Sequence, residues 1–357
     1  MESVANCIWS YEKDDPAWDD FVGSLPDGHY EQSTCWARVR EADGWQSIRL
    51  RVERNGKICA GAQILFRKIP WIGKVGYIPY GPCIPAGSDE LTNEFVAEVK
   101  KKAGLEHWGY VVMNLPAFGH PMVPILKKNG FSPAMKELPP NVLISSTLLI
   151  DLSKDLDDIF AGLKSKIRQN IRFGMREGLQ MREGAREDID IFFRLMLITC
   201  ERRKAQPLYP DVGSFYRFWD SFYAKGRVRL FFIDFQQEPV CSAFCFSFGK
   251  VLFLYQFGWS GEHAHLQPSK VLYWKTIEWA KTHGFRYCDF VSVDTEVAKA
   301  IEGGLPMTEE LQSKYFYGPT ILKMSFGGTV VHLPGPYACF PNVFLRIFSC
   351  TVLRMIL

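Results

Sequence analysis

The hydrophobic and polar positions in the first half of the chain follow helical and strand spacing in turn. The pattern predicts helices over 15–24 and 32–42, followed by alternating strands over 47–53 and 57–66. Asn55 and Gly56 separate these two strands, and this pair favours a two-residue hairpin turn. A strand is then expected at 74–78, a helix at 91–102, a strand at 110–115, a helix at 122–129 and a β-rich segment at 141–152. The first half is therefore predicted to be a mixed α/β unit.

The second half repeats that order. Helices are predicted at 155–177 and 188–204, and strands at 227–235, 239–248 and 251–258 form a meander with short turns between them. A helix at 268–282 has Pro268 near its start and Gly284 after its end, and a buried strand at 286–293 follows. Because the same succession of elements occurs twice, we infer an internal duplication of the secondary structure.

The doubled order indicates an α/β fold class with mixed sheets, built from two tandem N-acetyltransferase-like (GNAT) domains. GNAT domains that use acetyl-CoA need a glycine-rich loop that opens a helix, because its backbone N–H groups bind the pyrophosphate. Neither half of this sequence contains such a loop. The sequence therefore points to a different acyl donor.

The composition limits the possible classes of protein. A chain of 357 residues with 47% hydrophobic and 23% charged residues is expected to fold, as two domains. The net charge of +3 is too small to indicate a nucleic-acid binder as a whole, so any basic footprint must be local. The ten cysteines follow no framework spacing and residues 1–20 contain no apolar core segment, which favours a reducing cytoplasm.

Membrane contact is expected to be peripheral at most. No run of 18 uncharged apolar residues occurs, which argues against a membrane-spanning helix. The tail at 340–357 has the pattern of an amphipathic helix with a wide apolar stripe. Such a helix either docks on its own domain or lies on the inner surface of the plasma membrane.

Five short motifs, in this order, resemble the Fem family of aminoacyltransferases, which build peptidoglycan interpeptide bridges from aminoacyl-tRNA. The motifs are QSTCWARVR at 32–40, YIPYGP at 77–82, LKSKIRQNIR at 163–172, Thr199-x-x-Arg202, and ILKMSFGG at 321–328. The resemblance implies that the end of the chain crosses back to the first domain. We therefore expect a first domain of 1–146 plus 320–357 and a second domain of 147–319. No charged heptad segment occurs, so the chain resembles the short members that lack a helical arm.

The resemblance also implies a reaction and its partners. Aminoacyl-tRNA would be the co-substrate, with no other cofactor and no metal, and a UDP- or lipid-linked muropeptide would supply the acceptor amine. The protein is expected to be a monomer. Lys323 would be the catalytic residue, a fixed cation for the oxyanion of the tetrahedral intermediate. The alternative is a surface lysine at the end of a strand.

The diphosphate of such an acceptor requires paired cations, for which arginine is well suited. Arg40 and Arg202 match the family's phosphate-binding positions, one in each domain, and Arg38 and Arg203 are the adjacent fallbacks. Both arginines have a solvated helix face as the alternative.

The resemblance also implies a peptide-binding cleft between the two domains, lined by Tyr80 and Tyr255. Their alternatives are a tyrosine satisfied in a turn and a core residue. The family often has Asp shortly after its Gly-Pro, where this sequence has Pro85, with Asp89 and Glu90 as the nearest acids. The general base therefore stays unassigned, and a different acceptor stays open.

The predicted helix at 155–177 carries a stripe of cations. Lys164, Arg168, Arg172 and Arg176 are spaced four residues apart, so they would share one face. Such a stripe fits the phosphate backbone of tRNA, although a solvated helix face has the same pattern.

Three other functions remain open. The first is a tRNA-dependent amide ligase that acts on a small peptide or natural-product amine. The second is a thioester-dependent N-acyltransferase of exopolysaccharide synthesis. The third is a non-catalytic scaffold at the membrane face.

Cys241 and Cys245 lie on one strand face with Ala243 between them, which indicates core packing rather than a metal site.

Overall fold

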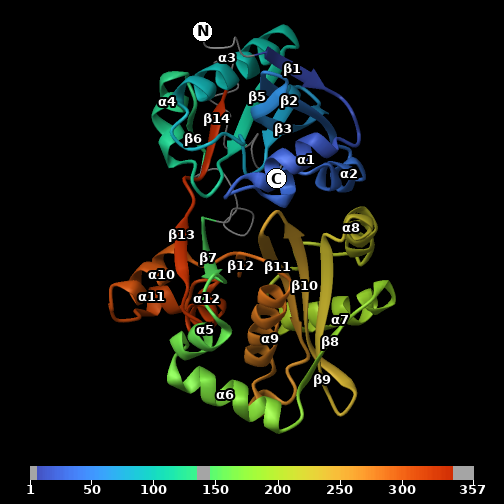
Figure 1. Ribbon diagram of the computed structural model, residues 1–357, viewed down its shortest axis with the longest axis vertical. Coiled ribbons are helices and arrows are strands. Elements are labelled where there is room, and N and C mark those ends of the chain that lie inside the picture. The colour runs from blue at the N-terminus through green and yellow to red at the C-terminus, as the bar shows by residue number, and fades with distance from the viewer. Residues whose placement is uncertain (1–5, 135–144, 341–357) are drawn as a thin grey trace. The chain divides into compact units, whose positions relative to one another are not determined.

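The computed structural model describes residues 6–134 and 145–340, which form two compact units (Figure 1). Unit 1 consists of Met1–Ser145 together with His332–Leu357, and unit 2 of Ser146–Val331. The return of the chain to the first unit thus begins at 332, whereas the sequence placed it at 320. Lys323 consequently belongs to unit 2.

Unit 1 is built on a seven-stranded mixed sheet. Its strand order is β1-β2-β3-β4-β5-β14-β6. The strands are β1 (Asn6–Ser10), β2 (Gln46–Arg54), β3 (Lys57–Ile69), β4 (Gly73–Ile78), β5 (Trp108–Asn114), β6 (Ser132–Pro133) and β14 (Pro336–Cys339). Asn55 and Gly56 have φ of 51° and 71°, which confirms the predicted hairpin turn between β2 and β3. β4 and β5 run parallel, and β14 fills the place beside β5.

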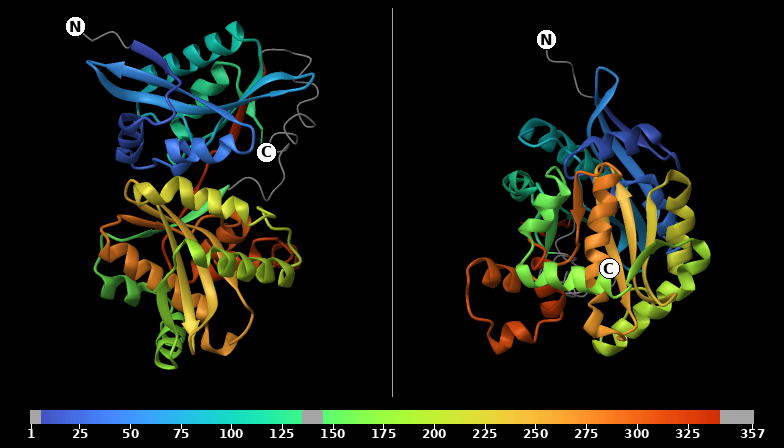
Figure 2. Two further views of the ribbon diagram at one scale, coloured as in Figure 1. Left: turned by 90° about the vertical axis from the view of Figure 1, so that its right-hand side faces the viewer. Right: turned by 60° about the horizontal axis from the view of Figure 1, so that its bottom comes forward.

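Helices cover both faces of this sheet. α3 (Asp89–Leu105) and α4 (Val123–Lys128) pack on one face, where Phe95, Val96 and Leu126 join the strands in a buried cluster. α1 (Pro16–Ser24) and α2 (Thr34–Glu41) lie on the other face (Figure 2), joined by the short 3-10 helix η1 (Tyr30–Gln32). The 3-10 helix η2 (His120–Met122) precedes α4. The predicted helices and strands of this half are present within a few residues, whereas residues 141–144 of the β-rich segment lie outside the described part.

Unit 2 contains a second mixed sheet of seven strands. Its order is β13-β7-β12-β11-β10-β9-β8, and β11 and β12 are parallel. The strands are β7 (Ser146–Asp151), β8 (Gln180–Glu183), β9 (Val228–Phe235), β10 (Glu238–Phe248), β11 (Val251–Trp259), β12 (Tyr287–Asp289) and β13 (Thr329–His332). Cys241 and Cys245 are buried in the core of this sheet, as expected.

The helices of unit 2 again cover both faces. α9 (Pro268–Thr282) packs on one face of the sheet, and α7 (Ile189–Arg202) packs on the other, where Gly258 of β11 approaches Met196 closely (Figures 1 and 2). The remaining helical elements are α5 (Leu156–Gly162), α6 (Ser165–Arg176), η4 (Arg186–Asp188), α8 (Gly213–Phe222), η5 (Tyr223–Lys225), η6 (Ala264–Leu266), α10 (Thr295–Glu302), α11 (Glu309–Gln312) and α12 (Tyr317–Met324).

The single helix predicted over 155–177 is wrong, because the chain forms two helices there. Leu163 and Lys164 are extended, with ψ of 150° and 139°, and they separate α5 from α6. Leu163 is 2% exposed and packs in the core, so burial of this side chain at the joint accompanies the break. Helical periodicity alone does not reveal such a joint, since both sides of it keep good helix formers.

The duplication inferred from the sequence is present in the topology. In each unit an antiparallel meander leads into a crossover helix and then into a strand parallel to the last meander strand: β2-β3-β4-α3-β5 in unit 1 and β9-β10-β11-α9-β12 in unit 2. The mixed α/β class is confirmed. In the part of the chain that the structure describes, no helix has the length and hydropathy needed to cross a membrane. Of the tail helix predicted over 340–357, residues 341–357 lie outside the described part of the chain.

Candidate functional site

Lys323 lies in the last turn of α12, so the expectation of a strand end was wrong. The helix accepts Pro319 in its first turn and ends before Gly327 and Gly328, whose φ values of 75° and 90° suit glycine. A Cβ at Gly328 would lie 2.7 Å from the carbonyl oxygen of Leu149, so glycine permits close packing on β7. The end of α12 and the two glycines after it therefore fix the backbone position of Lys323.

The ammonium group of Lys323 holds a turn that follows β12. Its Nζ donates hydrogen bonds to the carbonyl oxygens of Val291 (2.6 Å) and Ser292 (2.9 Å). Both residues have positive φ, 47° and 35°, which is unusual for a residue with a branched side chain such as valine. Strained backbone of this kind is concentrated at functional sites.

A buried carboxylate holds the same turn from the other side. Asp289, the last residue of β12, is 8% exposed, and its Oδ1 accepts the N–H of Val291 (2.7 Å) and the hydroxyl of Thr147. The backbone around Val291 is therefore held by the carboxylate of Asp289 on one side and by the ammonium group of Lys323 on the other. No sequence motif indicated Asp289 or Thr147; the available signal was a carboxylate inside a strand predicted to be buried.

Burial controls the charge of this pair. It lowers the pKa of Lys323 to about 7, against the favourable charge of Asp289, and the nearby Arg203 lowers it further. Burial likewise raises the pKa of Asp289 to about 6, although the hydrogen bonds from Thr147 and Val291 and the charge of Lys323 oppose the rise. Both groups therefore titrate near neutral pH, as groups in active sites often do.

This geometry leaves one proton of the ammonium group for a ligand. A lysine ammonium has three donors, and Val291 and Ser292 take two of them. A third N–H directed by two fixed hydrogen bonds can stabilise an oxyanion without reorganisation. We therefore regard Lys323 as the candidate catalytic cation of unit 2.

Arg202 ends α7 beside the end of β11. Its guanidinium lies 4.1 Å from the centre of the Trp259 ring, and it pairs with no carboxylate in the described ranges. Thr199 explains the motif spacing, because its hydroxyl accepts the N–H of Trp259 (2.7 Å). The same hydroxyl can donate its one proton to the carbonyl of Leu195 (2.9 Å) or to that of Trp259 (3.1 Å). The motif thus fastens α7 to β11 and presents an exposed arginine fork. Arg203, the fallback, donates to the carbonyl of Tyr315 and is the arginine that influences Lys323.

Tyr255 lies in an aromatic cluster of unit 2. Its hydroxyl is 2.5 Å from that of Tyr209, and its ring contacts Phe218 and Phe246. It is half-buried. The packing agrees with the alternative of a core residue, and a role in binding peptide stays a prediction.

Arg40 of unit 1 belongs to a small group of cations around an indole ring. It ion-pairs with Asp43 (2.8 Å), and its guanidinium lies 5.8 Å from the Trp45 ring. Arg67 of β3 lies 4.6 Å from the same ring, and burial together with the charge of Arg40 lowers its pKa. Arg67 is a second cation near Arg40 that the motif comparison did not reveal. Arg38 points to solvent.

Tyr80 of unit 1 is largely buried. Its ring stacks on His29 with 3.8 Å between centroids, and His29 Nδ1 accepts the N–H of Glu31. Burial raises the pKa of the Glu31 carboxyl to about 8, with Arg40 opposing. The sequence did not identify this carboxyl group, which lies close enough to Arg40 for the two charges to interact. Of the acids considered from the sequence, Asp89 begins α3 and Glu90 pairs with Arg54.

The predicted cationic stripe is only partly present. Lys164 precedes α6 and does not share its face. Arg168 donates to the carbonyl oxygens of Ala161 and Leu163 and so caps α5, and Arg176 pairs with its neighbour Glu177. Arg172 lies 5.0 Å from the ring of Phe160. Because a four-membered face needs one continuous helix, this prediction was wrong in its geometry, while the question of tRNA binding stays open.

Comparisons with known proteins identify the chain's relatives. The FemAB family model matches residues 14–114, and the model of an acetyltransferase (GNAT) domain matches 165–297. The solved structure "Crystal structure of FemX" superposes on 97% of this chain and all of its own, with a TM-score of 0.83 and 19% identity. The chain resembles the FemABX proteins in part of its sequence and in its fold. The two tandem GNAT-like domains predicted from the sequence are thereby confirmed.

The FemABX-like chain also matches curated enzymes. It is 27% identical to the lipid II:glycine glycyltransferase of Staphylococcus haemolyticus over 240 residues, which are 62% of this chain and 54% of that protein. The glycyltransferase of the same name from Staphylococcus aureus is 27% identical over 233 residues, 60% of this chain and 52% of that one. The match thus spans about half the length of these relatives. A tandem GNAT protein from the clavulanic acid biosynthesis pathway shares the fold with a TM-score of 0.50 and 8% identity, over 95% of this chain and 99% of its own.

Proposed function

We propose that this FemABX-like chain is an acyltransferase that moves an amino acid from aminoacyl-tRNA to an amine of a peptidoglycan-precursor stem peptide. The observation that carries the proposal is the Lys323 centre of unit 2, where two carbonyl oxygens direct a partly buried ammonium group. The curated relatives named lipid II:glycine glycyltransferase support this reaction and favour a lipid-linked precursor as acceptor.

The reaction is the aminolysis of an ester. The neutral acceptor amine attacks the carbonyl carbon of the aminoacyl ester, and the carbonyl oxygen becomes an oxyanion. The free N–H of Lys323 donates to this oxygen, which lowers the barrier by about 3–4 kcal/mol. The C–O bond to the ribose then breaks, an amide remains, and the proton lost by the amine ends on the ribose hydroxyl. Since the ester is already activated, the chemistry requires no further cofactor.

Arg40 in unit 1 and Arg202 in unit 2 are each proposed as a diphosphate-binding residue. Arg40 lies beside a second cation, Arg67, over Trp45, and Arg202 presents an exposed fork on Trp259. Arginine forks suit diphosphate oxygens, because two parallel N–H groups contact two oxygens. Tyr80 and Tyr255 are proposed to contact the peptide part of the acceptor.

The competing hypothesis is that the acyl donor is a thioester, because residues 165–297 match the model of an acetyltransferase (GNAT) domain. The segment between β11 and α9 argues against it. Pro268 opens α9 without an N–H group, and the N–H groups of Lys270 and Val271 donate back to the carbonyl of Gln267 (3.0 and 3.3 Å). Backbone donors for a CoA pyrophosphate are therefore scarce at this helix end.

The deciding experiment supplies the purified chain with a mixed pool of charged tRNAs and one acceptor at a time. The acceptors are UDP-linked muropeptide, lipid-linked muropeptide and unrelated peptide amines, and mass spectrometry detects an added aminoacyl group. Uncharged tRNA and Lys323→Met are the controls, and acyl-CoA replaces tRNA in a further arm. We expect a product with a muropeptide only when the tRNA is charged.

Three results would change the assignment. Product with peptide amines alone would favour the ligase for small molecules, and product with acyl-CoA would favour the exopolysaccharide acyltransferase. Unmodified acceptor with every charged tRNA would overturn the proposal. An Arg40→Ala variant separately tests diphosphate binding, and Lys57→Ala, which removes an exposed cation of the same unit, is its control. The KM for the acceptor should rise about tenfold with an unchanged kcat in the Arg40 variant only. The reaction is proposed to take place in the cytoplasm, on a monomeric protein.

A further inference from the structure

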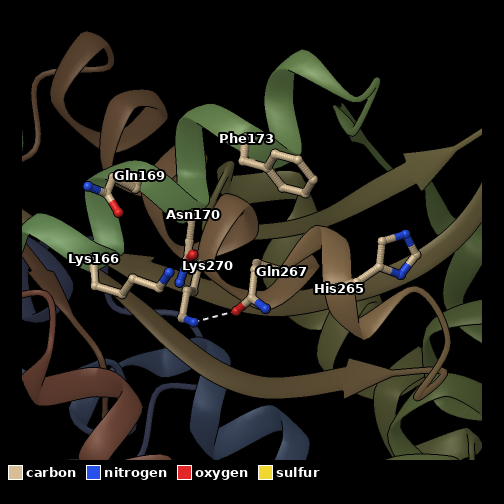
Figure 3. A pocket seen from close by; sticks show the side chains of 7 residues that line it. All are labelled: Lys166, Gln169, Asn170, Phe173, His265, Gln267 and Lys270. Carbon is tan, nitrogen blue, oxygen red and sulfur yellow. Dashed lines mark hydrogen bonds between the residues drawn. The ribbon is translucent and has the colours of Figure 1, made fainter.

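A polar groove lies between α6 and α9 of unit 2, on a different side of α6 from Arg168 and Arg172. The groove is open to one side and has a volume of about 610 Å³. Lys166, Asn170 and Phe173 of α6 line it, spaced four and three residues apart, and they face Lys270 of α9 and His265 of η6 (Figure 3). Helix spacing explains why these side chains share one face, since positions i, i+4 and i+7 coincide on an α-helix.

The groove concentrates positive charge that the protein does not neutralise. The pKa of Lys270 is lowered by burial and by the charge of Lys166. Neither lysine forms an ion pair with a carboxylate among residues 6–134 and 145–340. Within the described part of the chain, the acceptor of Lys270 is the neutral amide oxygen of Gln267. Two like charges that face the same space are stabilised by an anion between them.

The rest of the lining indicates what kind of anion fits. Amide side chains of Gln169, Asn170 and Gln267 can hydrogen-bond to base edges and ribose hydroxyls, and the rings of Phe173 and His265 offer faces for stacking. Lysines for phosphates together with rings for bases are typical of sites for single-stranded nucleic acid. A bare diphosphate would leave the rings and amides unused.

We propose that this groove, rather than the predicted Lys164 stripe, holds a phosphodiester and an adjoining base of a single-stranded RNA end. The inference rests on the proposed function, in which the donor is a charged tRNA. It deepens that proposal, because it assigns the donor's unpaired 3′ end to residues of unit 2 that no motif indicated.

Binding of a short RNA tests the groove directly. The probes are an uncharged RNA hairpin with a single-stranded 3′ tail and the same hairpin without the tail, titrated against the full chain at several salt concentrations. Lys166→Gln combined with Lys270→Gln is compared with Lys164→Gln combined with Arg176→Gln, which removes the same charge outside the groove. Circular dichroism checks that both variants are folded.

The groove variant should lose at least tenfold in affinity for the tailed hairpin. The slope of log affinity against log salt should fall by about 1, since each phosphate contact of a single strand contributes about 0.7. The stripe variant should lose about twofold at most, and the hairpin without a tail should not distinguish the two. An equal loss in both variants, or a groove variant that binds as the wild type does, would overturn the inference. A loss confined to binding of vesicles that contain phosphatidylglycerol would overturn it in favour of a lipid anion.

The inference and the proposed function fail in different ways. If the wild type forms product from charged tRNA and the groove variant forms it equally well at limiting tRNA, the reaction stands and the groove assignment is wrong. If every charged tRNA leaves the acceptor unmodified but the groove variant loses tailed RNA, the groove binds RNA and the proposed reaction is wrong.

Discussion

Replacing Lys323 by methionine tests the chemistry of unit 2 most directly. The variant keeps an unbranched side chain in the last turn of α12 and removes the ammonium group that donates to Val291 and Ser292. It also removes the one remaining donor that we assign to the oxyanion. Substrate binding does not use that donor, because the oxyanion exists only in the transition state.

The expected loss in kcat is about 100- to 1,000-fold, the size measured when one oxyanion donor is removed. The KM for the acceptor should change by less than about threefold. Stability should change little, because two effects oppose each other. Two carbonyl oxygens lose their donors at about 1 kcal/mol each, while the cost of holding a charge in a partly buried place disappears.

The stability of the folded chain offers an independent check on burial. Folding lowers the pKa of Lys323 from 10.5 to about 7, so the folded state binds fewer protons than the unfolded state between these pH values. The wild type therefore gains stability from this group as the pH rises across that window. Lys323→Met should lose this gain, which denaturant unfolding at pH 6 and pH 10 can measure.

The assay is single-turnover transfer from charged tRNA to muropeptide, followed by mass spectrometry. Lys299→Met is the matched control, because it removes an exposed lysine from the neighbouring α10 with the same change of charge. A folded Lys323→Met variant with kcat within threefold of the wild type would refute the oxyanion role. A variant with unchanged kcat and a strongly raised KM would show that Lys323 binds substrate instead.

Three further predictions concern the same unit. The pH profile of kcat should fall above a pH of about 7 as Lys323 loses its proton, and Lys323→Arg should abolish this alkaline limb because arginine stays charged; a limb that persists in the arginine variant belongs to another group. Thr147→Val should raise the pKa of Asp289 beyond about 6, because the hydroxyl that stabilises its charged form is lost. A less charged Asp289 stabilises the Lys323 ammonium less, so the alkaline limb should shift to lower pH, whereas Thr147→Ser should keep the wild-type profile. Identical profiles in all three proteins would contradict the coupling of Asp289 to Lys323. Gly174→Ala should lower the free energy of unfolding by about 1–3 kcal/mol, because its Cβ would lie 2.4 Å from the carbonyl oxygen of Leu266, whereas Gly162→Ala meets nothing within 4 Å; equal melting temperatures would show that α6 can move without cost.

Local sequence determined much of the secondary structure. Asn55-Gly56 predicts its own turn, because few other residues accept positive φ at both positions, and Pro268 and Gly284 mark α9 through preferences that act within one turn. The order of helices and strands, which occurs twice, likewise predicted two GNAT-like units, because each element was predicted from its own short segment of sequence. The motifs indicated Lys323 and Arg202 as site residues, but they did not predict the hydrogen bonds and ring contacts of these side chains.

Tertiary packing decided what local patterns could not. The joint at Leu163 and Lys164 follows from burial of Leu163 in the core, and it removed Lys164 from the helix face that periodicity had assigned to it. The meeting of Lys323 with Asp289 joins residues 34 positions apart, and its pKa values arise from burial, which no sequence window contains. The groove of Lys166 and Lys270 likewise depends on two helices about 100 residues apart in the sequence. A sequence specifies which side chains are available, while desolvation and long-range contacts decide which of them act together.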